Sequence, residues 1–380
     1  MTIPIPYVTL VALLELCAFV YASPSATRNI RVNSSVVAII LFFVFFAFRG
    51  FIFSDWISYY SFFQDCTWSD LFGYRLGSVT SYEPGFTLLC LICKSVFKDY
   101  FFFQFVVCLI DTVLLLRFFR GRVDNVALAL LLVFVFDGLG MFVNLLRNSI
   151  AIMIFLNAID FIRDRKPLPY FAMCTLAMSF HMTALVYFPL YFFFHRHLNK
   201  WMFLAVFVIC NVVFLAHIPV VVSLLRLLRI DEAFTDKVKA YTEVMTTSSV
   251  LSIGYIERLF TFALAFCFYD KLSSMKKENA IFLNALLAYF IATFFFAQFF
   301  DLSKRLANLF SFSYWIIWAY FINCFSYVRN KNIYIYFVSF YCLVKIWFMT
   351  QLPSLEYENL IFGIKSYQER LFIINTTFKD

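Results

Sequence analysis

The sequence predicts an all-α polytopic membrane protein with about 10–13 transmembrane or half-membrane helices. Two properties of the whole chain favour this fold class: 63% of its 380 residues are hydrophobic and only 14% are charged. A soluble domain is nearer half apolar and a quarter charged. The apolar runs also reach the ~20 residues of a membrane helix, beyond the ~10 of a transmembrane strand. We therefore expect residues 1–380 to form a single transmembrane domain.

The apolar runs follow one another with short polar breaks between them. We expect spans at about residues 5–22, 35–53, 100–116, 125–143, 148–162, 201–222, 251–269, 280–300, 306–328 and 332–350. Residues 84–97 are apolar but short, which favours a re-entrant or interfacial helix. Residues 168–194 are long, and Ser179, His181 and Thr183 interrupt them. This stretch is either one tilted helix or two short helices that meet near His181.

Lys and Arg cluster in six of the polar breaks, which predicts that these breaks face the cytoplasm. The clusters are Arg28 and Arg31; Arg117, Arg120 and Arg122; Arg163, Arg165 and Lys166; Arg196 and Lys200; Lys271, Lys276 and Lys277; and Arg329 and Lys331. One alternating topology accommodates all six if residues 168–194 cross twice, whereas a single crossing would invert the 271–277 loop. That topology places both termini and two longer loops, 54–82 and 223–250, on the outer side. The second loop is a candidate lid over a site that opens outward.

Ionisable side chains within membrane spans cost about 2.5–3.5 kcal/mol on insertion scales, so each is a candidate site residue. Arg147 lies at the predicted outer junction of two spans. Its guanidinium can bind a phosphate through two hydrogen bonds, or it can simply extend toward lipid headgroups. His181 lies at the expected helix break. There a neutral imidazole can act as acid or base, or it can be an ordinary hydrogen-bonded core histidine.

Two more arginines belong to later spans. Arg305 follows Asp301 at an expected outer helix end, and the structural alternative is an ion pair between them at i, i+4 spacing. Arg258 follows Glu257 about two turns into its span. For Arg258 the structural alternative is a buried ion pair with Glu257.

Four further candidates border the first outer loop. Arg49, Asp55 and Tyr59 lie where the second span meets this loop, and Glu83 precedes Pro84 at its end. A carboxylate here can be a general base or can orient an arginine. Equally, Asp55 and Glu83 can be N-caps of the helices that follow them.

This arginine-rich set favours a polyanionic ligand, most simply a phosphate or diphosphate. The sequence has no Walker loop, no dinucleotide glycine fingerprint and no HExxH, so nucleotide hydrolysis and zinc proteolysis are disfavoured. An outer acidic pair of the DxD kind is also missing, which disfavours a metal-assisted sugar-nucleotide enzyme. Cys90 and Cys93 form a CxxC without a second ligand pair, so we interpret them as packing residues. We expect no metal and no cofactor.

The order and spacing of the candidates resemble the EpsG/Wzy-type family of bacterial polysaccharide polymerases, over most of residues 35–325. The segments that carry the resemblance are Arg49 with Asp55-Trp-Ile-Ser-Tyr59-Tyr60, Tyr82-Glu83-Pro84-Gly85-Phe86, Leu146-Arg147-Asn148-Ser149-Ile150-Ala151, Ala177-Met-Ser-Phe180-His181-Met-Thr183-Ala184-Leu185 and Lys304-Arg305-Leu306-Ala307-Asn308-Leu309-Phe310. The chain departs from the family pattern at Asn148, where Gln is usual, and at Thr183, where Ser is common.

The resemblance implies a metal-independent glycosyltransferase of the bacterial inner membrane, with its two long loops and its active site in the periplasm. Its substrates would be oligosaccharide repeat units on undecaprenyl diphosphate, joined into O-antigen, capsule or exopolysaccharide. The catalytic residues would be His181, Arg147, Arg305 and Glu83, and the substrate-binding residues Arg49, Asp55, Tyr59 and Arg258. Implied partners are the lipid-linked glycans, the bilayer, a chain-length regulator and a flippase, with no nucleic acid.

Other functions remain open on the residues alone. A lipid-linked oligosaccharide flippase or other transporter would also hold arginines inside a helix bundle. It should show two related halves, and no internal repeat is evident in the sequence. An O-antigen ligase would perform the same chemistry with a lipid A acceptor, and a membrane acyltransferase would use an Arg and a His on an acyl donor.

Overall fold

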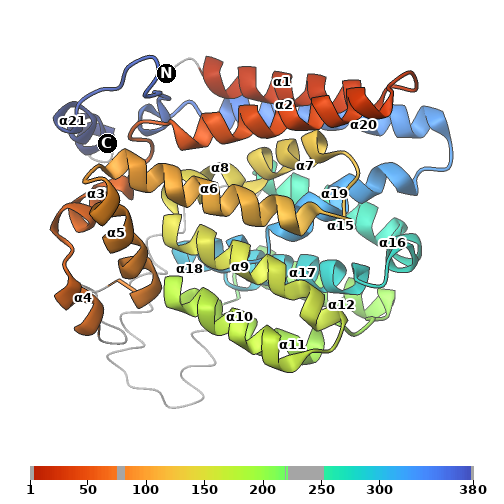
Figure 1. The fold of residues 1–380 in the computed structure, drawn as a ribbon. Coiled ribbons are helices and arrows are strands. Elements are labelled where there is room, and N and C mark those ends of the chain that lie inside the picture. Colours follow the sequence, from red (N-terminus) through yellow and green to blue (C-terminus); the bar gives the residue numbers. More distant parts are fainter. Residues whose placement is uncertain (1–3, 75–81, 219, 221–251, 378–380) are drawn as a thin grey trace, which may run out of the picture. The chain divides into compact units, whose positions relative to one another are not determined.

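The computed structural model describes residues 4–74, 82–218, 220 and 252–377, and helices dominate this part of the chain (Figure 1). The expected lid loop, 223–250, lies outside the described residues, as do residues 75–81 of the first outer loop. Five helices in the described ranges are long and apolar enough to cross a membrane, namely Ile5–Ala22, Arg28–Ala47, Tyr100–Phe119, Val126–Asn144 and Val328–Met349. The predicted all-α polytopic membrane fold is therefore confirmed.

The chain divides into two compact units, Met1–Tyr191 with Tyr327–Asp380, and Phe192–Ser326. The described helices of the first unit are α1 Ile5–Ala22, α2 Arg28–Ala47, α3 Trp56–Asp65, α4 Trp68–Phe72, α5 Pro84–Val96, α6 Tyr100–Phe119, α7 Val126–Val133, η1 Phe134–Gly138, α8 Leu139–Asn144, α9 Leu146–Arg163, α10 Pro167–Phe180, η2 Met182–Tyr187, α20 Val328–Met349, η4 Pro353–Leu355 and α21 Tyr367–Thr377. Helix α11, Leu190–Phe193, crosses the boundary between the units.

Helix α9 forms the centre of the first unit. Its side chains from Leu146 to Ile162 are almost all buried, which suits its nearly continuous run of apolar residues. Helices α6 and α10 pack along it (Figure 1). A helix that is apolar all round is expected at such a buried position. The polar residues in its first turn are thereby held at one fixed place, at the end of the bundle.

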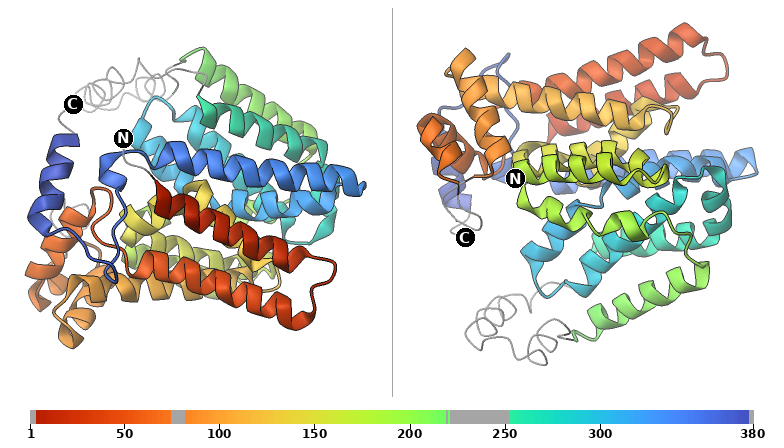
Figure 2. Two further views of the ribbon diagram at one scale, coloured as in Figure 1. Left: turned by 90° about the horizontal axis from the view of Figure 1, so that it is seen from above. Right: turned by 60° about the horizontal axis from the view of Figure 1, so that its bottom comes forward.

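The helices of the first unit give it two chemically different ends. At one end Arg28 begins α2, and Arg122 after α6 donates to Asp160 near the end of α9. At the opposite end Tyr7, in the first turn of α1, donates to the carbonyl of Leu355 beyond α20. Helices α1, α2 and α20 lie side by side and run between these two ends (Figure 2). The basic breaks of this unit therefore gather at the end away from the start of α9.

Residues 168–194 fold as two short helical arms that meet at His181, which is the second of the two alternatives left open by the sequence. Helix α10 ends at Phe180, and η2 then returns along it. The Tyr170 hydroxyl donates to the carbonyl of Tyr187 at 2.5 Å, and Arg165 donates to the carbonyl of Tyr191 at 2.7 Å. The chain thus comes back to the end where α10 begins, as the distribution of basic residues requires.

Helix α2 covers residues 28–47, although the sequence predicted a span at 35–53. The helix stops early because the following backbone pairs with the C-terminal segment instead. Gly50 donates to the carbonyl of Glu358 at 2.9 Å, and Leu360 donates to the carbonyl of Phe48 at 2.8 Å. Arg28 is the first residue of this helix, and Thr27 caps it.

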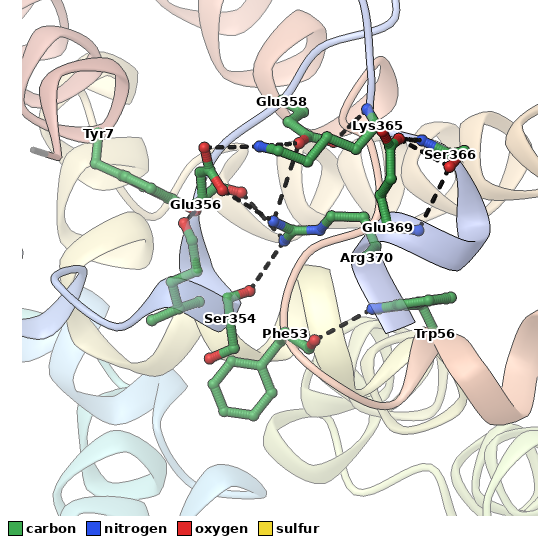
Figure 3. A network of polar contacts seen from close by, with 11 residues as sticks. Tyr7, Phe53, Trp56, Ser354, Glu356, Glu358, Lys365, Ser366, Glu369 and Arg370 are labelled. Atoms are coloured by element: carbon green, nitrogen blue, oxygen red, sulfur yellow. Dashed lines mark hydrogen bonds and ion pairs between the residues drawn. The ribbon is translucent and has the colours of Figure 1, made fainter. Parts of the chain in front are cut away.

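The segment after α20 is fastened by a buried arginine (Figure 3). Arg370 is fully buried and donates to the carbonyls of Ser354 and Glu356, both at 3.2 Å. Lys365 pairs with the carboxylates of Glu356 at 2.7 Å and Glu358 at 2.9 Å. Burial acts to lower the pKa of Lys365, but the hydrogen bonds and charges of these two carboxylates outweigh it and raise the pKa. This network ties residues 354–370 to one another, and the backbone bonds of Glu358 and Leu360 join the segment to the end of α2.

The second unit is also helical. Its described helices are α12 Lys200–Leu215, α15 Ile253–Cys267, α16 Tyr269–Met275, α17 Asn279–Phe290, η3 Ile291–Phe295, α18 Phe300–Asn308 and α19 Phe312–Cys324. The predicted span at 280–300 ends instead in the π-turn η3, and 306–328 is shortened to α19. Ser303 donates to the carbonyl of Ala292 at 2.9 Å, so that a carbonyl at the π-turn fixes α18.

Candidate functional site

The first turn of α9 is tied to three other elements by three successive side chains. Arg147 donates from Nη1 to Oε2 of Glu83 at 2.6 Å, at the start of α5. Asn148 accepts from the hydroxyl of Thr183, in η2, at 3.0 Å. Ser149 donates to the buried carboxylate of Asp111, in α6, at 2.6 Å. The short sequence Arg-Asn-Ser therefore brings segments from distant parts of the chain together at one end of the bundle.

Glu83 holds both Arg147 and the backbone after the helix break. It occupies the N-cap position of α5 but makes no capping hydrogen bond, so the capping alternative does not describe it. Its Oε1 accepts from the backbone N–H of Met182 at 3.0 Å, while Oε2 accepts from Arg147. The Glu83 side chain is only 8% exposed. Because both oxygens are engaged, this geometry suits a residue that orients Arg147 better than it suits a general base.

Gly85 allows the start of α5 to approach the end of α10. A Cβ at this position would lie 2.5 Å from the hydroxyl oxygen and 2.8 Å from the carbonyl oxygen of Ser179. No real Cβ tolerates such contacts, so a larger residue would push the two helices apart. The sequence Glu83-Pro84-Gly85 thus supplies the carboxylate, a helix start and the close contact that lets Glu83 reach Met182.

Arg147 lies over the Tyr82 ring and keeps part of its surface open. Its guanidinium carbon is 4.2 Å from the centre of the Tyr82 ring, and its side chain is 22% exposed. Burial raises the pKa of Tyr59 and Tyr82, and the nearby charge of Arg147 opposes this effect in both. Both phenols therefore stay neutral hydrogen-bond donors. Within the described ranges, Nε of Arg147 is buried without a hydrogen-bond partner, so the protein does not use every donor of this guanidinium.

His181 joins α10 to η2, and its ring is held by the backbone that follows. Nδ1 accepts from the backbone N–H of Thr183 at 3.1 Å and lies 2.9 Å from the Thr183 hydroxyl. A backbone N–H can only donate, so Nδ1 must carry a lone pair there. In a neutral imidazole the proton is then on Nε2, which is a donor. This arrangement favours His181 as a hydrogen-bond donor and disfavours it as a base through either nitrogen.

Asp55 and Tyr59 flank the same cluster from α3. The backbone N–H of Asp55 donates to Oδ1 of Asn144 at 2.8 Å, which fixes the start of α3 beside the end of α8. Asp55 has no capping hydrogen bond, so the capping alternative does not describe it either. Its partly exposed carboxylate acts electrostatically on Tyr59 and Tyr82. Asp55, Tyr59, Glu83, Arg147 and His181 are the predicted residues that belong to this site.

Arg49 lies in the interior instead. Arg49 is 2% exposed, and its side chain donates to the carbonyl of Phe46 at 2.5 Å. The side chain of Gln104 donates to the backbone carbonyl of Arg49 at 2.8 Å. Its backbone also forms a bridge with Asn359 of the C-terminal segment. These contacts give Arg49 a structural place at the end of α2, and its predicted role in substrate binding stays a prediction.

Arg258 and Arg305 belong to the second unit. Arg258, in α15, lies 5.9 Å from the centre of the Tyr289 ring, and its charge reaches the hydroxyl of Tyr314. Arg305, in α18, is exposed. Among the described residues Arg305 has no ion-pair partner, so the Asp301–Arg305 pair considered as its alternative is not formed. Their roles as anion ligands stay predictions.

Several residues of the site were missed in the sequence. Tyr82, Asn148, Thr183 and Asp111 all contact a predicted site residue or its neighbour. The first three stand beside Glu83, Arg147 and His181 in the chain, so adjacency was an available signal. For Asp111 the sequence offered no such signal, because a single carboxylate in an apolar helix does not indicate which residue it contacts. No group of three His, Cys, Asp or Glu residues that could hold a metal occurs in the ranges the structure describes.

A protein-family model matches most of the chain. The model of the EpsG family matches residues 33–366, which include every predicted site residue. No curated protein and no solved structure matches the chain. The match covers most of the chain and agrees with the resemblance carried by the segments around Glu83, Arg147 and His181. The chain belongs to the EpsG family.

Proposed function

We propose that this protein is a polysaccharide polymerase that joins oligosaccharide repeat units carried on a membrane lipid diphosphate. Membership of the EpsG family supports a polymerase-type role in polysaccharide biosynthesis. The observation that carries the finer proposal is the setting of Arg147. It is held by Glu83, keeps a buried Nε–H without a partner in the described part of the chain, and belongs to one hydrogen-bonded cluster with His181.

The reaction needs few chemical groups. A hydroxyl of the incoming unit attacks the anomeric carbon of the growing chain, the bond from that carbon to the diphosphate oxygen breaks, and the hydroxyl proton leaves to a base. The electron pair stays on the lipid diphosphate, where negative charge develops. Arg147 and the Nε2–H of His181 are donors suited to that charge, because fixed donors stabilise an anion that forms in a water-poor site. Glu83 positions Arg147, and the partly exposed Asp55 is our candidate base.

The distribution of basic residues supports an orientation. Cytoplasmic loops of membrane proteins are rich in Lys and Arg, and the basic breaks of the first unit lie at the end away from Arg147. We infer that the cluster faces the periplasm in the bacterial inner membrane. The lipid is then undecaprenyl diphosphate, as the family resemblance implies. Arg258 and Arg305 remain candidate diphosphate ligands in the second unit.

Polymerisation in vitro tests the proposal. Purified protein in lipid nanodiscs is given a defined lipid diphosphate-linked repeat unit, and the product ladder is resolved by gel electrophoresis. We expect Arg147→Ala to abolish the ladder, whereas Arg163→Ala, a change of the same residue type near the other end of α9, leaves it intact. The same assay is applied to Arg258→Ala, Arg305→Ala and Asp55→Asn. Folded Arg147→Ala protein that polymerises at the wild-type rate would refute the proposal.

Two isosteres separate the possible roles of His181. The amide nitrogen of Gln can stand near Nε2 and donate, whereas the amide oxygen of Asn stands near Nδ1 and can accept from the Thr183 backbone. If His181 stabilises the leaving group, His181→Gln retains more activity than His181→Asn. The opposite order would mean that the ring only shapes the helix break.

A further inference from the structure

The first unit contains a cavity of about 460 Å³ that is separate from the cluster around Arg147. Its walls come from α3, from the start of α6 and from residues 364–369 of the C-terminal segment. The volume lies within the ~300–1,000 Å³ of typical small-molecule sites. None of the predicted site residues lines it.

Aromatic rings form much of this cavity. The Tyr60 ring lies 4.9 Å from the Tyr367 ring and 5.4 Å from the Tyr100 ring, and Phe51 lies 6.1 Å from Tyr100. Trp56 packs edge-on against Tyr367 at 5.3 Å. The wall is therefore rigid and offers ring surface and polar edges together, as is typical of sites for amphipathic ligands.

The polar groups of the wall have unused hydrogen-bonding capacity. Among the described residues, the hydroxyls of Tyr60, Tyr100 and Tyr367 and the side-chain amide of Gln64 have no hydrogen-bond partner. Tyr100 is only 2% exposed. Its ring is buried, whereas its hydroxyl is not among the enclosed side-chain atoms and can bond to a molecule in the cavity. Water or a ligand with several hydroxyl groups would satisfy these donors and acceptors.

The charges around the cavity disfavour an anion. Lys365 is already neutralised by Glu356 and Glu358, while Asp99 and Glu369 add negative charge to the lining. The cavity thus differs from the Arg147 cluster, whose donors suit a diphosphate. Its chemistry suits a neutral, hydroxyl-rich molecule, such as an uncharged sugar.

Helix α3 connects the cavity to the cluster. Tyr59 faces the Arg147 side, where its ring lies 6.1 Å from that of Tyr82. The adjacent Tyr60 faces the cavity, against Tyr367. Helix α3 therefore lies between the cavity and the cluster around Arg147 and borders both. A glycan of several sugars with its diphosphate at Arg147 can extend across α3.

We propose that this cavity binds a neutral sugar residue of the lipid-linked glycan, away from the bond that is transferred. This inference rests on the proposed polymerase function, because it takes the glycan to be the substrate. The same chemistry is offered by the incoming repeat unit and by the growing chain. Tyr60, Tyr100 and Tyr367 contribute hydroxyls, and Gln64 contributes its amide.

Binding is measured first, without catalysis. The probe is the free oligosaccharide released by mild acid from the lipid-linked repeat unit of the producing cells, and saturation-transfer NMR follows its binding to the protein in nanodiscs. We expect Tyr60→Phe and Tyr367→Phe each to weaken binding by about 2- to 12-fold, the range for one hydrogen bond. Tyr336→Phe, at a position 67% exposed on α20, is the matched control and leaves binding unchanged. The inference is overturned if the wild-type protein does not bind the probe, or if both cavity variants bind it as tightly as wild type does.

Polymerisation kinetics then identify the source of the sugar. A raised KM for the lipid-linked unit in Tyr367→Phe identifies the incoming unit. An unchanged first coupling with shorter products identifies the growing chain. Arg147→Ala keeps the two proposals apart, because it should still bind the free oligosaccharide while it fails to polymerise. A wild-type protein that binds the probe but forms no polymer would refute the proposed function and leave the sugar site standing.

Discussion

The Glu83–Arg147 ion pair supports a quantitative prediction for stability. Glu83→Gln removes the counter-charge of Arg147 but keeps an amide oxygen that can accept one hydrogen bond. Removing one partner of a fully buried pair costs about 3–5 kcal/mol, and a hydrogen bond to a charged group contributes about 1.5–3 kcal/mol. The Arg147 side chain is 22% exposed, so solvent screens part of the loss. We expect Glu83→Gln to destabilise the protein by about 2 kcal/mol.

Arg147→Gln should cost more, about 3 kcal/mol, because it leaves the carboxylate of the 8% exposed Glu83 without its cation. The double variant replaces the pair with two neutral amides. We expect its loss to be smaller than the sum of the two single losses by at least about 1 kcal/mol, which is the coupling of residues in contact. Thermal unfolding at one fixed scan rate, followed by tryptophan fluorescence in the same detergent, measures all four proteins. Strictly additive losses would show that the ion pair contributes nothing.

Glu83→Gln also distinguishes two chemical roles for Glu83. If Glu83 only positions Arg147, the substitution should remove about 2 kcal/mol of transition-state stabilisation. The rate would then fall about 30-fold, and its pH dependence would be unchanged. If it were the general base, Glu83→Gln would remove the acid limb of the pH–rate profile. Single-turnover rates across the pH range in nanodiscs make this comparison. Loss of the acid limb would refute the positioning role.

Three further changes have clear expected outcomes. Gly85→Ala places a Cβ 2.5 Å from the Ser179 hydroxyl, so overpacking should cost about 1–3 kcal/mol and lower polymerisation, as seen in unfolding and product ladders. Thr183→Val removes the hydroxyl bound to Asn148 and should cost about 1 kcal/mol, whereas Thr183→Ser should behave as wild type in the same unfolding experiment. Arg370→Met should loosen the C-terminal segment, because two carbonyls lose their donor, and limited proteolysis should cut it faster than wild type. Unchanged proteolysis of Arg370→Met would show that the arginine does not fasten this segment.

The sequence indicated which polar residues come together in the candidate site, because its signals are local. Glu83, Arg147 and His181 are polar residues at interruptions of apolar runs, where hydropathy and charge identify them directly. The turn at His181 was one of two alternatives, since polar residues divided a long apolar run that could also have formed one tilted helix. What periodicity could not predict was the partner of each residue. That Glu83 spans Arg147 and Met182 depends on the close packing of α5 on α10, which no pattern encodes.

Arg49 shows the opposite case. Its position after an apolar span resembled that of Arg147, yet it is buried and donates to the backbone carbonyl of Phe46. The difference arises from residues 354–364, whose backbone pairs with the end of α2. Main-chain pairing over such a separation leaves no pattern in side-chain hydropathy. The aromatic cavity escaped prediction for the same reason, because Tyr367 completes it from the far end of the chain.

The contacts of the C-terminal segment also have a consequence for biosynthesis. The hydroxyl of Tyr7 meets its acceptor, the carbonyl of Leu355, across 348 positions of sequence. Chains emerge from the ribosome with the N-terminus first, and distant contacts form slowly. The first helix must therefore be inserted long before its last neighbour has been translated. We expect the bundle to reach the bilayer as an unfinished intermediate. The end of the first unit that carries Arg147 and the aromatic cavity should mature only after residues 354–370 have been translated.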